Sequence, residues 1–85
     1  MSPYRILELP PIIQRKIESE QWLLSETLID RRFELDYPIE KMAKIADVEM
    51  DIYLKLEYCD IDIPVEDYVK ALHNLDTYIL IKYDL

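Results

Sequence analysis

The sequence predicts a mainly α-helical fold of four to five helices, and three observations support this class. Apolar residues make up 51% of the 85 residues, too many for a disordered chain, and most recur at helical spacing. Prolines stand where helices are expected to begin, a position that tolerates the missing backbone N–H. The length supports one hydrophobic core. We therefore expect a single domain over residues 1–85.

The N-terminal part is expected to form a short strand followed by a long helix. Residues 4–9 are bulky and partly alternating, as in a strand, and Pro10 and Pro11 end that segment. From Pro11 to about Leu35 the chain is rich in helix formers and carries two apolar stripes. One stripe contains Ile13, Ile17, Leu24 and Leu28, and the other contains Trp22, Ile29 and Phe33. Two stripes need two covering surfaces, so Trp22 is either a core residue or a contact with a partner.

Three further helices are expected in the remainder of the chain. They cover residues 38–46, 49–58 and 64–75, and Asp47 is expected to close the first of them in the left-handed conformation, because glycine is absent. Residues 78–83 are β-branched and aromatic, which favours a strand that would pair with the N-terminal one; a continuation of the helix is the alternative. The expected core contains Leu28, Met42, Ala43, Val48, Tyr53, Leu56, Tyr68 and Leu75, with Val69 and Leu72 also facing inward.

The inventory of reactive side chains argues against an enzyme. The chain has one cysteine, Cys59, and one histidine, His73, so no internal disulfide, histidine pair or cysteine cluster for zinc can form. Without glycine there is no phosphate-binding loop of the usual kinds. Asp60 and Asp62 alternate as in a calcium loop but lack its glycine and its distal glutamate. We expect no catalytic residue, no metal and no cofactor.

Hydropathy and charge narrow the setting and the partners. No stretch approaches the roughly 18 apolar residues that span a bilayer, and the N-terminus lacks a secretory signal pattern, so we expect a cytoplasmic protein without membrane contact. The net charge is −8. Residues 1–32 contain five acidic and five basic side chains, whereas residues 33–85 contain thirteen acidic side chains and five lysines. A nucleic-acid-binding surface requires the opposite sign.

A framework of small and apolar residues runs through residues 27–75. Met42-Ala43 lies in the second expected helix, Ala46-Asp47-Val48 at its end, and Leu56-Glu57 at the end of the third; a loop with a proline follows. This order and spacing resembles the Xre family of helix-turn-helix domains, also called lambda-repressor-like, in which the corresponding positions carry Leu-Ala, a small residue before Gly-Val, and Ile-Glu. The resemblance implies an N-terminal arm and helical extension at 1–26, the helix-turn-helix core at 27–75, and a strand-like tail at 76–85.

Departures from the family fall where DNA would be touched. The family's second helix opens with Thr-Gln, and here Pro38 and Ile39 stand at those positions. Its third helix begins with small polar residues that reach base edges in the major groove. The corresponding residues here are Glu49, Met50 and Asp51, with Leu54 at a later outward position. Carboxylates repel phosphate, so the scaffold is expected to be kept without its DNA-binding face.

Two functional hypotheses follow from this combination. The first is a small regulator that binds a protein partner, as an antitoxin, a phage-type regulator or an antagonist of a basic nucleic-acid-binding protein. Its partner would be a toxin, a repressor or another basic protein, and its candidate contacts are Trp22, Ile39, Glu49, Met50, Asp51 and Leu54. The second is a dimeric, sequence-specific DNA-binding repressor that uses Arg31, Arg32, Lys41, Lys44 and Lys55. A solvated acidic face without a role is the third interpretation.

A homodimer is expected under either functional hypothesis. The strand-like tail over residues 78–83 offers an apolar edge, and exposed edges of that kind are normally paired or covered.

Overall fold

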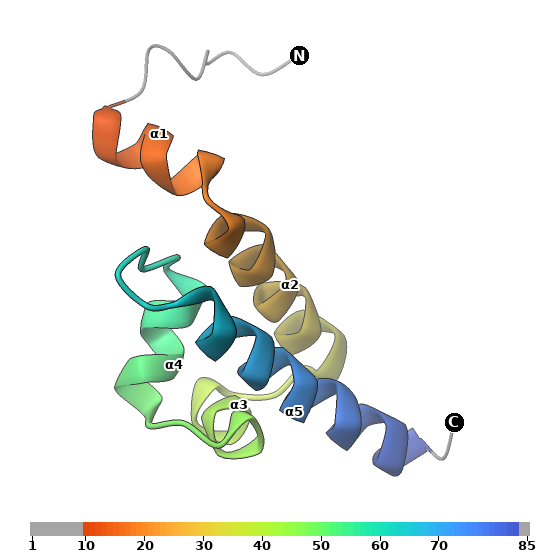
Figure 1. Cartoon of the computed structure of the whole chain (residues 1–85). Helices are drawn as coiled ribbons and strands as arrows, with labels where there is room; N and C mark the ends of the chain where they lie inside the picture. The colour runs from red at the N-terminus through yellow and green to blue at the C-terminus, as the bar shows by residue number, and fades with distance from the viewer. Residues whose placement is uncertain (1–9, 84–85) are drawn as a thin grey trace.

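The computed structural model of the chain describes residues 10–83, which form five helices (Figure 1). They are α1 (Pro11–Glu18), α2 (Glu20–Leu35), α3 (Ile39–Ala46), α4 (Met50–Glu57) and α5 (Val65–Tyr83). The longest two, α2 and α5, lie side by side and run in the same direction, while α3 and α4 pack against them (Figure 1). The short α1 contacts α2 and lies at one end of the molecule. The class is therefore mainly α-helical, as the sequence predicts.

The single helix expected from Pro11 to about Leu35 is broken at Ser19. The backbone of Ser19 is extended, with φ −83° and ψ 155°. Its N–H and its hydroxyl both donate to the carbonyl oxygen of Lys16, at 3.2 and 2.6 Å, which closes α1 and turns the chain. The expectation of one continuous helix is wrong at this residue. Helix α2 then runs through residues 26 and 27 without interruption.

The tail forms the end of α5, so the predicted strand over 78–83 is wrong and the alternative of a continued helix is confirmed. Ile79 packs against the core. The ring of Tyr78 meets that of Tyr37 edge-on, with centroids 6.2 Å apart and hydroxyl oxygens 3.2 Å apart. These contacts outweigh the weak β preference of the residues. The expected strand at 4–9 lies outside the described residues.

The core lies where α2, α3, α4 and α5 converge. Of the eight predicted core residues all but Val48 are buried, and Val48 is half-buried against the core. The prediction that Val69 faces inward is wrong, because its side chain is 50% exposed. The side of α5 that faces the core carries Tyr68 and Leu72, and Val69 lies beside that side. The prediction that Leu72 faces inward is confirmed, and the core also contains Leu35, Ala46, Cys59 and Ala71.

Helices α2 and α3 end in left-handed residues, and a third such residue follows the end of α4, although the chain has no glycine. Asp36, Asp47 and Cys59 have φ values of 56°, 61° and 58°, which confirms the expectation for Asp47. The backbone N–H of Val48 donates to the carbonyl of Ala43 and that of Asp47 to Lys44, as in a Schellman motif. A left-handed L-residue costs roughly 1–2 kcal/mol relative to its right-handed form, so these three positions carry local strain.

Candidate functional site

Two of the predicted contact residues lie together in a groove between α2, α3 and α4. Ile39 begins α3 and Leu54 lies in the middle of α4. Together with Ile29 of α2 and Tyr58, which follows α4, they line a hollow of about 400 Å³. Its polar lining residues are Arg32 and Glu57. We call these six residues the α2–α4 groove.

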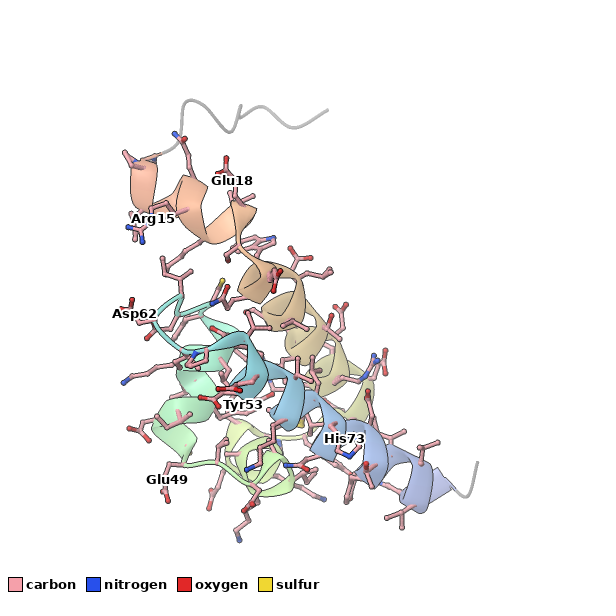
Figure 2. The ribbon with its side chains drawn as sticks, viewed as in Figure 1. Arg15, Glu18, Glu49, Tyr53, Asp62 and His73 are labelled. Carbon is pink, nitrogen blue, oxygen red and sulfur yellow. The ribbon has the colours of Figure 1, made fainter. Side chains whose placement is uncertain are left out.

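The start of α4 presents a second group of predicted residues to solvent. Glu49 caps α4 without a side-chain hydrogen bond, and Met50 and Asp51 form its first turn. All three are exposed, Met50 by 49%, and Glu49 projects outward from the beginning of α4 whereas Tyr53 points inward (Figure 2). A turn of three residues, 47–49, joins α3 to α4. The start of α4 therefore offers an apolar side chain between two carboxylates.

Trp22 lies apart from these residues along α2. It is half-buried and stands about two helical turns before Ile29. It does not line the α2–α4 groove. The stripe that contains Trp22, Ile29 and Phe33 in the sequence therefore divides: Ile29 lines the groove, whereas Phe33 is 70% exposed next to the Arg32 guanidinium.

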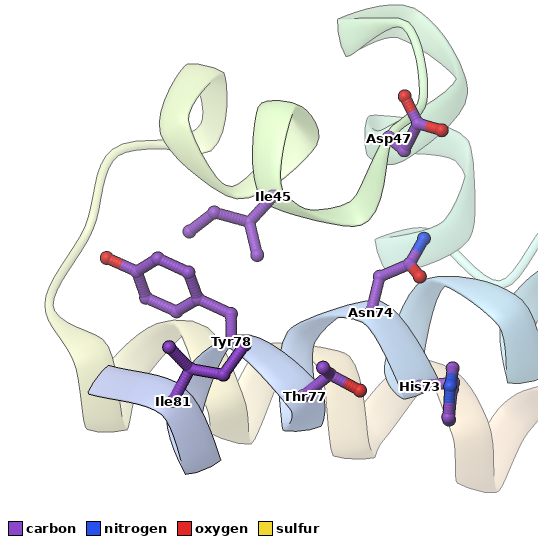
Figure 3. Close-up of a pocket in the computed structure, with 7 residues that line it drawn as sticks. All are labelled: Ile45, Asp47, His73, Asn74, Thr77, Tyr78 and Ile81. Carbon is purple, nitrogen blue, oxygen red and sulfur yellow. The ribbon is translucent and has the colours of Figure 1, made fainter. Parts of the chain in front are cut away.

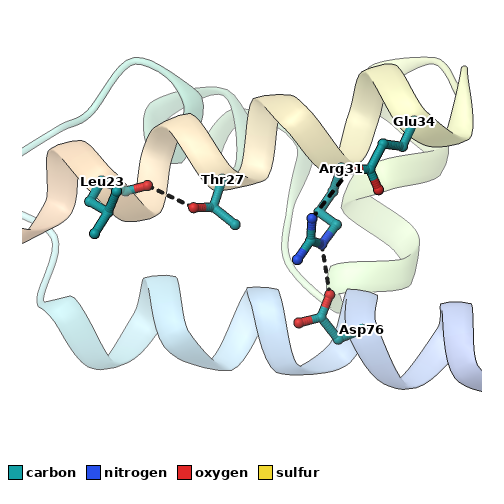
Figure 4. Close-up of polar contacts among 5 residues, drawn as sticks. All are labelled: Leu23, Thr27, Arg31, Glu34 and Asp76. Carbon is teal, nitrogen blue, oxygen red and sulfur yellow. Dashed lines mark hydrogen bonds and ion pairs between the residues drawn. The ribbon is translucent and has the colours of Figure 1, made fainter.

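The two arginines assigned to DNA contact are ion-paired to neighbouring helices. Arg31 Nε lies 2.9 Å from Asp76 Oδ1 of α5, and Arg31 Nη1 lies 3.5 Å from Glu34 Oε1 (Figure 4). Arg32 binds Glu57 of α4 through two nitrogens: Nε to Oε2 at 2.9 Å and Nη2 to Oε1 at 3.0 Å. These hydrogen bonds raise the pKa of both guanidinium groups. Consecutive arginines thus tie α2 to two different helices.

The Arg32–Glu57 pair covers a buried phenol. Tyr53 is fully buried on α4, and burial, followed by the neighbouring Glu57 carboxylate, raises its pKa well above the ordinary value. The Glu57 side chain is itself 9% exposed and that of Arg32 is 27% exposed. Partly buried charge-assisted pairs of two parallel hydrogen bonds are among the stronger polar contacts in proteins. The pair therefore contributes to the packing of α2 on α4.

The three lysines assigned to DNA contact are exposed and lie on two helices, α3 and α4. Lys41 Nζ lies 3.8 Å from the centroid of the Tyr37 ring. Lys44 is one turn further along α3, and Lys55 is on α4. Lys41 and Lys44 line one hollow with Pro38 and Glu40, whereas the Arg31 guanidinium is directed at α5 and that of Arg32 at α4.

Several residues of the groove were not identified by sequence reasoning. Glu57 matched the family framework but carried no signal for its pairing with Arg32. Tyr58 is 73% exposed, and nothing in its helix-end position distinguishes it from a core aromatic. Ile29 did carry a signal, because it lies on the second apolar stripe of α2.

A second hollow of about 400 Å³ lies between α3 and α5 (Figure 3). Ile45, Tyr78 and Ile81 gather at one end, while His73 and Asn74 lie toward the other. Asn74 Nδ2 donates to the carbonyl of Ala46 at 2.9 Å, so this amide fixes the end of α3 on α5. Thr77 lines the hollow between these two groups, one turn of α5 after His73. The hollow is therefore lined by both apolar and polar side chains.

Within residues 10–83, no three histidine, cysteine or acidic side chains gather as potential metal ligands. No helix in the same range is long and apolar enough to cross a membrane. Comparison with models of protein families, with curated proteins and with solved structures found no match to this chain.

Proposed function

We propose that this protein is a small helical regulator that acts by binding another protein through the α2–α4 groove and the start of α4. The observation that carries the proposal is the combination of an apolar groove lined by Ile39 and Leu54 with arginines that are already paired. Guanidinium groups are the side chains best suited to phosphate. Here both already bind a carboxylate, which offsets their charge toward a phosphate.

The character of this surface also suits a protein contact. Protein interfaces are enriched in aromatic residues, methionine and arginine at their centre, and Tyr58, Met50 and Arg32 lie in or near the groove. Methionine adapts its shape to a partner at low cost. Because Glu49 and Asp51 flank Met50, a partner with cationic side chains around an apolar contact fits best. A toxin, a repressor or another basic nucleic-acid-binding protein has that chemistry.

The arrangement of α3 and α4 supports an Xre-like interpretation of the fold as part of the same proposal. Two helices of eight residues are joined by a turn of three residues, and Val48 of that turn packs on the core. In this interpretation α4 occupies the position of the helix that reads DNA in the family, and its outward residues serve protein recognition instead.

Binding to the product of the adjacent gene tests the proposal, with purified components and isothermal titration calorimetry. Leu54→Lys places a charge in the groove, where Leu54 is half-buried, and should weaken binding by about tenfold or more. The matched control is Ile81→Lys, a change at a side chain that is 76% exposed on α5, and it should leave the affinity unchanged. Circular dichroism confirms that each variant is folded.

The same proteins separate this function from DNA binding. A shift of the neighbouring intergenic DNA at low salt that is lost in the double variant Lys44→Glu, Lys55→Glu would replace the proposal with a DNA-binding repressor. Equal loss of partner binding in Leu54→Lys and Ile81→Lys would also contradict it, because the groove would then have no special part.

A further inference from the structure

Helix α1 carries apolar side chains that the described chain does not cover. None of its residues is buried, and Ile12 and Ile13 are 49% and 37% exposed. Its principal neighbour is the start of α2. Isolated helices shorter than about 12–15 residues are marginal in water, so an eight-residue helix with exposed isoleucines calls for a covering surface.

The charge of this end of the chain is opposite to that of the rest. Residues 1–18, up to the end of α1, contain three cationic side chains and two acidic ones, for a charge of +1, whereas residues 19–85 contain seven and sixteen, for −9. Arg15 is exposed on α1 at the end of the molecule away from His73 (Figure 2). It forms no ion pair with any residue in the range 10–83. Helix α1, which we call the arm, is therefore both apolar and basic.

An apolar surface with acidic edges lies where α2 and α5 run side by side. We call it the α2–α5 face; it consists of Leu23, Thr27, Asp30 and Glu34 of α2 and Val69, Asp76 and Leu80 of α5. Leu23 is 69% exposed, and Val69 and Leu80 are 50% and 53% exposed. Residues spaced by three, four or seven share one side of a helix, and Arg31–Asp76 joins the two helices along this face (Figure 4).

The α2–α5 face points away from the α2–α4 groove. Leu23 and Arg32 are nine residues apart, which is about two and a half turns, so they lie on opposite sides of α2. Arg32 faces α4 through Glu57, and the hydroxyl of Ser25 donates to the carbonyl of Glu57 at 2.8 Å. The two surfaces can therefore be occupied at the same time.

We propose that α1 of one copy of this chain docks on the α2–α5 face of a second copy. The isoleucines of α1 would cover Leu23 and Val69, and Arg15 would approach the carboxylate of Asp30, since Glu34 and Asp76 are already paired with Arg31. Complementary charge and complementary apolar surface on one chain identify a second copy as the occupant. Given reciprocally, the exchange closes a two-fold pair in which each arm covers the other body.

Helix α1 cannot reach the α2–α5 face of its own chain. One residue, Ser19, separates α1 from α2, whereas a helix that folds back on its neighbour needs a connection of about 2–8 residues. Contacts on the other side also hold α1: Lys16 Nζ donates to the carbonyl of Tyr58 at 3.5 Å, and Ser19 Oγ lies 3.8 Å from Cys59 Sγ. The arm can therefore cover the α2–α5 face of another molecule but not that of its own chain.

Sedimentation equilibrium of the full chain and its variants tests the exchange. The arm variant is Ile12→Asp, Arg15→Glu, and the face variant is Leu23→Lys, Val69→Lys. Each should weaken self-association by about tenfold or more, and added salt should weaken that of the wild type. Met50→Lys is the matched control, since Met50 is as exposed as Ile12 but lies on α4, and it should leave self-association unchanged.

An equimolar mixture of the arm and face variants distinguishes this exchange from other dimers. The mixed pair contains one intact arm and one intact face, so it should associate more strongly than either variant alone. A contact of arm with arm or of face with face would gain nothing from mixing and would overturn the proposal. A wild-type chain that stays monomeric at hundreds of micromolar, or an equal loss in Met50→Lys, would overturn it as well. None of these outcomes depends on the proposed partner of the α2–α4 groove.

Discussion

Helices α1 and α3 have closely similar local features but differ in burial: α3 is part of the core and α1 is not. Each has eight residues, follows a proline at its N-cap, and lacks a side-chain hydrogen bond at that cap. Each has a basic side chain in its last turn, Lys16 in α1 and Lys44 in α3. Yet α3 buries Met42, Ala43 and Ala46, whereas α1 buries none of its residues.

The difference comes from what each helix meets. Helix α3 packs on both α4 and α5, and Asn74 of α5 donates to its last carbonyl. Helix α1 meets mainly the start of α2. In short helices most of the stability comes from packing of the apolar side and little from propensity. Amphipathic pattern thus identifies a helix, while its partner decides whether the helix belongs to the core.

The largest expected effect comes from truncating one apolar side chain in each helix. Met42 is fully buried, so Met42→Ala should reduce the free energy of unfolding by about 2–5 kcal/mol through lost burial and a cavity. Ile13→Ala should cost less than about 1 kcal/mol, because Ile13 is already 37% exposed. Denaturant unfolding at low protein concentration measures both. Equal losses would mean that α1 is part of the core after all.

A smaller effect is expected where the two helices end. Asp47 closes α3 with φ 61°, whereas Ser19 closes α1 with φ −83°. Asp47→Gly should therefore raise the free energy of unfolding by about 0.5–1 kcal/mol, since glycine adopts the left-handed region without strain. Ser19→Gly should lower it, because glycine loses the hydroxyl that donates to Lys16 and has more conformational freedom in the unfolded chain. Thermal unfolding of the two variants gives the comparison; the opposite order of stabilities would contradict it.

The smallest expected effect concerns a phenol that connects α3 to the end of α5. Tyr37 precedes α3; the hydrogen bond donated by Lys82 lowers its pKa to about 8, and Tyr78 and the charge of Lys41 act in the same direction. Since the folded state favours the ionised form, this stabilisation is present above pH 10, the ordinary pKa, and is lost as the pH falls through 8. A tyrosinate absorbance titration should show one early step that disappears in Tyr37→Phe. An early step that persists would assign it to another tyrosine.

The sequence predicts the helices and most of the core, because their apolar residues recur with the helical period. Two features were not predicted in this way. The break at Ser19 has a weak sequence signal, a serine before Glu20 as at a helix N-cap, inside a segment that otherwise favours helix; local hydrogen bonds from Ser19 to Lys16 fix it. The tail is helical because Tyr78 packs against Tyr37 and Ile79 packs against the core. The β propensity of these residues is too weak to oppose this packing.

For the candidate site, spacing could place residues on a face but could not reveal their partners. Sequence positions predict Ile39 and Leu54 as separate contacts, and the structure brings them into one groove. The charge of Arg31 and Arg32 predicts two free cations. Their partners Asp76 and Glu57 lie 45 and 25 residues away in the sequence, and no local pattern links them. The homodimer was predicted from a strand edge that is helical here, so it now depends on α1 and the α2–α5 face.

The buried thiol just after α4 can report local opening of the structure around it. Cys59 is the one thiol of the chain, is 2% exposed, and lies under the turn at Ser19. A thiol reagent can reach its sulfur only when α1 or the loop after α4 moves away, so the rate of modification follows the population of that local opening rather than global unfolding. The docking of α1 on a second copy would have to hold α1 in place or pull it from Cys59. Protection or acceleration of labelling on self-association would tell these two motions apart without any added probe.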